Sequence, residues 1–172
     1  NGIKEFFSTV ADATKSGISM VYQEQSLLPN ITVGENILLG VEGSAIKFGT
    51  YSPRGIQRKA LEYLKRVNLD IDPRTRTEEL SFGTRQMIEV AKALAVAEFS
   101  GKPPIVLLDE PTSVLERNEI KILFDVVKSI KKETSVVFIS HRLEEVLEIS
   151  DRVYVMRDGE IVSEVNPQEV TV

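Results

Sequence analysis

Short apolar runs alternate with longer amphipathic stretches along this chain. Ile105–Leu108 is an unbroken apolar run that ends in two acids and a proline. A run this short, bounded by a breaker, predicts a strand buried on both faces of a parallel sheet. Thr134–Ser140 predicts a second apolar strand, and Ile18–Tyr22 alternates in the manner of a third.

Helical periodicity fills the intervals between these runs. Ser8 can cap a short first helix, and Thr32 can cap a helix that begins at Val33 with Glu35 in its first turn. Pro53 is well placed to start a helix, because its missing N–H costs nothing there. The predicted helices are Ser8–Lys15, one from Val33, one from Pro53 to Val67, one from Ser81 that ends before Pro103-Pro104, Arg117–Glu133 and Leu143–Ile149.

Two of these helices carry a clear apolar face, and the chain finishes in a predicted hairpin. The expected buried positions are Ala60, Leu61, Leu64 and Val67 in one helix and Ile120, Leu123, Phe124, Val127 and Ile130 in the other. Asp158-Gly159 separates two alternating segments, 151–156 and 160–165, which is a strong signal for a β-hairpin. Residues 40–53 contain glycine and serine and are predicted to form a loop.

This order of elements predicts the fold class. Strand and helix alternate, so we expect an α/β protein with a mostly parallel sheet flanked by helices. An all-helical insert from about Val33 to Leu80 interrupts the alternation.

Composition narrows the class of protein without naming a function. The 172 residues are enough for one domain with a core, and the net charge of −5 provides no basic surface for nucleic acid. No apolar run reaches the roughly 20 residues that span a bilayer. The sequence has no cysteine, which excludes disulfides and thiolate metal sites. The opening Asn1-Gly-Ile, without an initiator methionine, indicates a fragment of a longer protein.

Polar residues gather where the predicted strands end. Gln23 follows one strand, Asp109 and Glu110 end another, and His141 follows the third. Because carboxyl ends of parallel strands share one edge of a sheet, these side chains should converge. Such a set resembles a phosphoryl-transfer site, in which one residue holds the metal and another activates water. Taken singly, each has an ordinary alternative, such as an acid pair in a turn or a structural histidine.

A second polar cluster opens the helix at Ser81. Ser81 and Gly83 lie where the first helical N–H groups are unpaired and the helix dipole favours an anion. The ordinary alternative is an N-cap in which Ser81 bonds only its own first turn.

Together these motifs resemble the ATPase of ABC transporters, and the resemblance covers essentially the whole chain in order. Gln23 falls at the Q-loop glutamine and His141 at the switch histidine. The longer motifs are Leu80-Ser-Phe-Gly-Thr-Arg-Gln86 for the signature, Ile105-Val-Leu-Leu-Asp-Glu-Pro-Thr-Ser113 for the Walker B aspartate and catalytic glutamate, and Ser113-Val-Leu-Glu116 for the D-loop. The fold implied is P-loop NTPase-like, with a partial RecA-like core in residues 1–23 and 100–172 and a helical ABC subdomain in residues 24–99.

The sequence departs from the family pattern at several points. Phe82 and Thr84 replace a glycine and the glutamine of the signature, and Glu116 replaces the usual aspartate of the D-loop. No Gly-x-x-x-x-Gly-Lys-Ser/Thr loop occurs anywhere in the 172 residues, so the lysine and hydroxyl that bind phosphates and Mg²⁺ are missing. In the family this loop precedes the Gln23 strand. We therefore expect a chain truncated at its N-terminus that hydrolyses no ATP by itself.

The resemblance implies a role for each site residue, with ATP and Mg²⁺ as ligands. Glu110 polarises the attacking water and His141 contacts the γ-phosphate, which makes these two the catalytic pair. Gln23 and Asp109 hold Mg²⁺, partly through water. The implied ATP-binding set is Gln23, Ser81, Gly83, Asp109, Glu110, Ser113 and His141, with Ser81 and Gly83 completing the site of a second ATPase domain.

Within the family the chain is most similar to the first ATPase half of ribose- and galactoside-type sugar importers. The residues that carry this likeness are Tyr22-Gln-Glu24, Met87-Ile-Glu-Val-Ala-Lys-Ala-Leu94 and Ser140-His-Arg-Leu-Glu-Glu-Val146. It implies an ATPase at the cytoplasmic face of the membrane, with a permease, a second ATPase domain and an upstream sugar-binding protein as partners and no nucleic acid. The alternatives are a non-transport ABC ATPase acting on ribosomes or nucleic acid, and a regulatory ABC domain without turnover.

Overall fold

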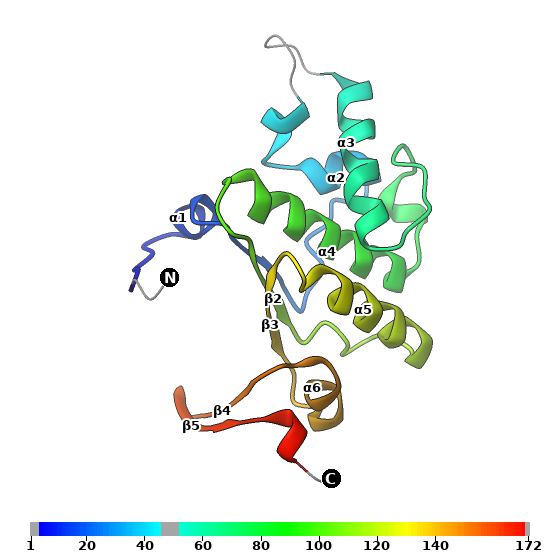
Figure 1. The fold of residues 1–172 in the computed structure, drawn as a ribbon. Helices are drawn as coiled ribbons and strands as arrows, with labels where there is room; N and C mark the ends of the chain where they lie inside the picture. Colours follow the sequence, from blue (N-terminus) through cyan, green and yellow to red (C-terminus); the bar gives the residue numbers. More distant parts are fainter. Residues whose placement is uncertain (1–3, 46–51, 171–172) are drawn as a thin grey trace.

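A three-stranded parallel sheet lies at the centre of the computed structural model, which describes residues 4–45 and 52–170 (Figure 1). Its strand order is β1 (Ile18–Val21), β2 (Ile105–Asp109) and β3 (Ser135–Ile139). Val21 pairs with Leu108, and Asp109 pairs with Ile139. The carboxyl ends of all three strands therefore meet at one edge, as the alternation of elements predicts.

Helices pack around this sheet and beside it. α4 contacts β1 and also packs against α2 and α3, so it joins the sheet to a group of helices at one side of the molecule (Figure 1). α5 covers one face of the sheet, where the Phe124 ring meets the Phe138 ring edge to face. The helices are α1 (Val10–Lys15), α2 (Val33–Leu38), α3 (Pro53–Arg66), α4 (Phe82–Phe99), α5 (Arg117–Ile130) and α6 (Leu143–Ile149), with 3₁₀ turns at Glu42–Ala45, Thr77–Glu79 and Pro167–Glu169.

The predicted hairpin forms a second, separate sheet. β4 (Val153–Arg157) and β5 (Glu160–Val165) pair antiparallel around Asp158-Gly159. Both turn residues have positive φ, 54° at Asp158 and 82° at Gly159. This conformation matches the twist of the two flanking strands, and glycine adopts it without strain.

The two faces of the central sheet differ in burial, which corrects the expectation of a strand buried on both sides. Val106 and Leu108 of β2 are fully buried, whereas Ile105 and Leu107 are only half-buried. On β3 the exposed fractions of Val137 and Ile139 are 47% and 44%. The face beneath α5 is covered, and the opposite face is covered less completely by the described residues.

Helix faces and ends agree with the predictions except in detail. In α3, Ala60, Leu64 and Val67 are buried, but Leu61 is 40% exposed and Ile56 lies inside instead. Leu61 follows Ala60 by about 100° around the helix, so it turns away from the face that Ile56 shares with Ala60.

Two predicted helix ends were wrong. Thr9, and not Ser8, caps α1, because its side chain accepts a hydrogen bond from the Asp12 N–H. α5 ends at Ile130, three residues before the predicted Glu133. The predicted loop at 40–53 contains a 3₁₀ turn, and its residues 46–51 lie outside the described part.

Candidate functional site

The sheet brings the predicted polar residues to one edge. Gln23 comes two residues after Val21, and Glu110 comes two residues after Leu108, the partner of Val21. His141 comes two residues after Ile139, which pairs with Asp109. Parallel register thus places Asp109 at the carboxyl end of β2, and Gln23, Glu110 and His141 just beyond the ends of three neighbouring strands.

Glu110 and His141 are in direct contact. The His141 Nδ1 lies 3.0 Å from Glu110 Oε1, and the Glu110 backbone N–H donates to the Ile139 carbonyl at 2.9 Å. The His141 side chain is 68% exposed and that of Glu110 is 30% exposed. With Nδ1 engaged, Nε2 remains free for another partner. The arrangement can therefore position a water beside a carboxylate and offer an imidazole to an anion.

Gln23 and Asp109 share the edge without a polar contact between them. Gln23 is exposed and Asp109 is half-buried. Among residues 4–45 and 52–170, no hydrogen bond or ion pair engages either side chain. Within that same part of the chain, no three His, Cys, Asp or Glu side chains group as a metal site. The carboxylate and amide oxygens are the ligand type that Mg²⁺ takes, usually together with substrate phosphates.

A groove of about 1100 Å³ runs between β3, α6 and the β4–β5 hairpin. His141 lines one end of it, together with half-exposed apolar side chains of β3 such as Val137 and Ile139. Gln23 and Glu110 do not line this groove. The predicted residues therefore share a sheet edge, but only His141 also faces the groove.

Within the described part of the chain, Ser81 and Gly83 form no hydrogen bond with Glu110 or His141. Ser81 caps α4 by accepting from the Thr84 N–H at 3.2 Å, which is the ordinary role considered for it. Gly83 is buried so closely against Glu119 of α5 that an added Cβ would collide with its carboxylate. Figure 1 shows the beginnings of α4 and α5 on the same side of the molecule. This cluster therefore packs against the start of α5.

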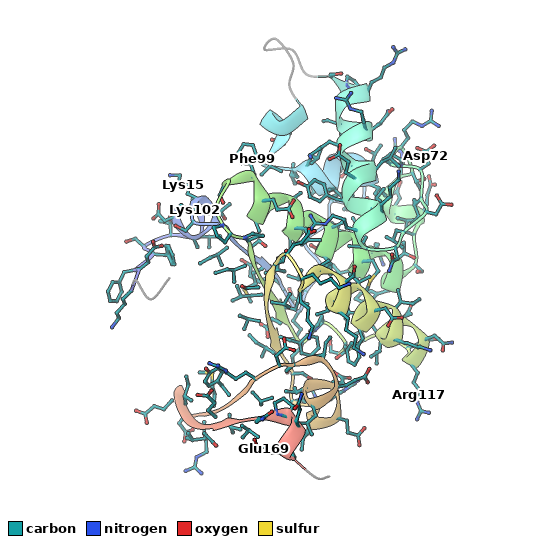
Figure 2. The ribbon with its side chains drawn as sticks, in the orientation of Figure 1. Lys15, Asp72, Phe99, Lys102, Arg117 and Glu169 are labelled. Atoms are coloured by element: carbon teal, nitrogen blue, oxygen red, sulfur yellow. The ribbon has the colours of Figure 1, made fainter. Side chains whose placement is uncertain are left out.

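Ser113 lies in the segment that leads from Glu110 to α5. Its backbone N–H donates to the Glu110 carbonyl at 3.2 Å, so it closes a turn directly after the acid pair. From this turn the chain runs to Arg117 at the start of α5, whose side chain projects from that end of the helix (Figure 2).

A network around Glu145 was not singled out from the sequence. Glu145 Oε2 accepts from Thr112 Oγ1 at 2.6 Å and from Ser140 Oγ at 3.2 Å, and Glu145 Oε1 lies 3.0 Å from Arg142 Nη1. The signal was present, because Glu145 lies four residues before the buried Ile149 and thus on the inward face of α6. An acid on an apolar helix face must find partners inside.

A second acid of this kind anchors the segment after Gln23. Glu89 of α4 is buried and accepts from the backbone and the hydroxyl of Ser26. The Gln25 amide also donates to the Phe82 carbonyl at 3.2 Å. Both contacts fasten the loop after β1 to α4, and an acid within the apolar run 87–94 was the signal for one of them.

Comparison with known proteins gives one family. The family model described as ABC transporter matches residues 3–113. The ribose import ATP-binding protein of Rubrobacter xylanophilus is 43% identical over 159 residues, which cover 92% of this chain and 30% of that protein. The xylose import ATP-binding protein of Thermoanaerobacter pseudethanolicus is 40% identical over 157 residues, which cover 91% and 30%. This chain thus spans about 30% of the length of these relatives.

Solved structures agree with this match. The dimeric post-hydrolysis state of the ATP-binding cassette MJ0796, bound to ADP and phosphate, aligns with a TM-score of 0.72 at 26% identity. The alignment covers 92% of this chain and 68% of that one. Across the described residues, no helix combines the length and the apolar character needed to cross a membrane.

Proposed function

The chain belongs to the ABC transporter family, and from this premise we propose that it forms the hydrolytic part of an ATPase that drives sugar import. The observation that carries the proposal is the 3.0 Å contact between His141 and Glu110 beyond two adjacent parallel strands. The 172 residues contain no Gly-x-x-x-x-Gly-Lys-Ser/Thr loop, so the proposed hydrolysis requires that a phosphate-binding loop be supplied to this chain. We call a polypeptide that joins this chain to such a loop the loop-containing ATPase.

In this proposal Glu110 and His141 divide the chemistry. The Glu110 carboxylate orients the attacking water and accepts its proton. His141 keeps Nδ1 on Glu110, so its Nε2 donates to a γ-phosphate oxygen when the ring is protonated. The exposure of the ring supports this role, because a substrate can reach it.

Gln23 and Asp109 are the proposed holders of Mg²⁺, partly through water. Their oxygen atoms suit this ion, and the Asp109 carboxylate has no protein partner among the described residues. When bound, Mg²⁺ neutralises charge on the phosphates of ATP. Asp109 and Gln23 would hold the metal-bound triphosphate at the carboxyl edge of the sheet, and Ser113 is proposed to contribute to ATP binding.

Ser81 and Gly83 are proposed to serve a second ATPase domain. They open α4, an 18-residue helix whose positive end suits a phosphate. The dimeric state of the solved relative MJ0796 supports action on another domain's ATP. The proposed division of this chain is a core of residues 1–23 and 100–172 and a helical subdomain of residues 24–99.

Sugar import is the proposed use of the ATPase. Its support is the set of relatives at 37–43% identity that are named as ribose, xylose or galactoside import ATP-binding proteins. The proposed partners are membrane permease subunits, with a sugar-binding protein upstream. The proposed location is the cytoplasmic face of the membrane, with the chain bound peripherally.

Replacing Glu110 by glutamine in the loop-containing ATPase tests the proposal. We expect ATP–Mg²⁺ affinity, measured by calorimetry, to stay within a few-fold of wild type. Turnover should fall by about 100-fold or more, because a general base contributes 10²–10⁴. Phosphate release under saturating ATP measures the turnover.

Glu144→Gln provides a matched control. Glu144 is an exposed acid on α6 whose side chain makes no hydrogen bond or ion pair among the described residues, so turnover should not change. Normal turnover in Glu110→Gln would remove Glu110 from its role and with it the hydrolytic function proposed here.

A further inference from the structure

We propose that Glu145 is a positioning residue that holds His141 against Glu110, an inference that rests on the hydrolytic function proposed above. Its carboxylate bonds three side chains, and each of them lies within two residues of Glu110 or His141 in the sequence. Thr112 follows Glu110 by two residues, and Ser140 and Arg142 stand on either side of His141. Glu145 thus joins the loop after β2 to the loop after β3.

The hydrogen bonds of Glu145 to Thr112, Ser140 and Arg142 are partly or fully shielded from solvent, which strengthens them. The Glu145 side chain is 11% exposed and Thr112 is 2% exposed. A buried carboxylate needs partners, and here the guanidinium of Arg142 and two hydroxyls supply them. Ser140 Oγ also accepts from the Arg142 backbone N–H at 3.0 Å, which closes the loop around His141. The hydroxyls of Thr112 and Ser140 both donate to Glu145 Oε2. If the Glu145 carboxylate is lost, the buried Thr112 hydroxyl has no acceptor for its hydrogen bond.

The backbone conformation of Glu110 explains why the two loops need to be held together by Glu145. Its φ is 44°, in the left-handed region that non-glycine residues occupy only when their surroundings hold them there. The hydrogen bond from the Glu110 N–H to the Ile139 carbonyl fixes the backbone before Glu110. The hydrogen bond from Thr112 Oγ1 to Glu145 fixes the chain after it. Glu145 has no recorded contact with Glu110 or His141, so it acts through its neighbours.

The single histidine of the sequence allows a direct test in the 172-residue chain, without ATP. The imidazole Cε1–H signal in NMR belongs to His141 alone. Glu110→Ala gives the position of this signal when the contact is lost. We expect Glu145→Gln to move the signal most of the way to that position and Glu144→Gln to leave it at the wild-type position. A wild-type signal in a folded Glu145→Gln chain overturns the proposal.

Thr112 supplies milder variants should Glu145→Gln unfold. Thr112→Val removes the hydroxyl but keeps the shape of the side chain, whereas Thr112→Ser keeps the hydroxyl. The proposal expects the His141 signal to shift in Thr112→Val and to return in Thr112→Ser. Equal signals in the two variants, both at the wild-type position, overturn it.

Kinetics of the loop-containing ATPase separates positioning from simple stability. We expect Glu145→Gln to lower kcat about tenfold to a hundredfold with KM for ATP within twofold, because misplacing a catalytic group slows chemistry more than binding. An unchanged kcat overturns the positioning role. If the proposed hydrolytic function is wrong, Glu110→Gln itself turns over ATP normally. The His141 NMR signal still shows in that case whether Glu145 maintains the contact between His141 and Glu110.

Discussion

Glu110 illustrates how single residues shape this site. Its left-handed backbone costs on the order of 1–3 kcal/mol for a residue with a Cβ. The conformation turns the chain sharply after β2, so that Ser113 bonds back to the Glu110 carbonyl. The same turn sets the Glu110 carboxylate beside His141. Strain at this position is therefore part of the geometry on which the proposed chemistry depends.

Gly83 gives a prediction at the same scale. A Cβ at this position meets the Glu119 carboxylate, which also accepts from the Glu116 N–H at 3.0 Å. We expect Gly83→Ala to destabilise the chain by about 1 kcal/mol, since the Glu119 carboxylate has to move and its capping bond to the Glu116 N–H is lost. Urea unfolding measures the change.

The double variant tests the cause. With Glu119→Ala already present, Gly83→Ala should instead stabilise the chain by about 0.5–1 kcal/mol, which is the ordinary helix preference for alanine. The same destabilisation in both backgrounds would show that Glu119 is not the obstacle.

At the scale of elements, α2 depends on its capping box. The Thr32 hydroxyl accepts from the Glu35 N–H, and the Glu35 carboxylate accepts from the Thr32 N–H at 2.9 Å. We expect Glu35→Ala to lower the free energy of unfolding by about 1 kcal/mol at pH 7. Glu5→Ala, at an exposed acid without side-chain contacts among the described residues, should change it little.

The pH dependence of this effect has a definite sign. The hydroxyl and the N–H of Thr32 hold the pKa of Glu35 below its ordinary value of 4.5. A lowered pKa in the folded state means that the stabilisation is present above about pH 4.5 and is lost as pH falls through the folded value. Unfolding at pH 3 should therefore show a smaller penalty for Glu35→Ala than unfolding at pH 7. An equal penalty would contradict the ionised capping box.

The elements themselves could be predicted from the sequence because their signals are local. The Thr32 cap, the Pro53 start and the Asp158-Gly159 turn each depend on residues within a few positions, and the structure has all three. The adjacent apolar pair Ala60-Leu61 did not show which of the two is buried. The angular position of each residue around the helix, relative to Ile56, decides it.

Tertiary features were harder to predict. The convergence at the strand ends followed from parallel pairing, and the Glu110–His141 contact agrees with it. The hydrogen bonds of Glu145 depend on which loop packs over α6, and no local sequence pattern predicts that packing. The partial exposure of one face of β2 likewise depends on which elements pack against that face. The apolar run in the sequence indicates only that the strand is suited to burial.

At the scale of the whole molecule, β3 is an edge strand within the described residues. Its outward side chains Val137 and Ile139 are half-exposed and apolar, and such an edge can pair with another chain. We expect the 172-residue chain to self-associate as its concentration rises in sedimentation velocity. Val137→Lys should shift the chain toward monomer.

Ile122→Lys is the matched control, since Ile122 on α5 is also 47% exposed but lies on a helix. It should leave the self-association unchanged. A chain that stays monomeric at high concentration, or equal effects of the two lysines, would show that β3 is not the pairing edge.

In the proposed mechanism Glu110 and His141 act as one unit in ATP hydrolysis. A double-mutant cycle of kcat in the loop-containing ATPase, with Glu110→Gln, His141→Ala and the double variant, measures whether they do. We predict strong non-additivity, with the double variant within about tenfold of the slower single variant. If the double variant instead loses the full product of the two single effects, the two residues act independently and the account is contradicted.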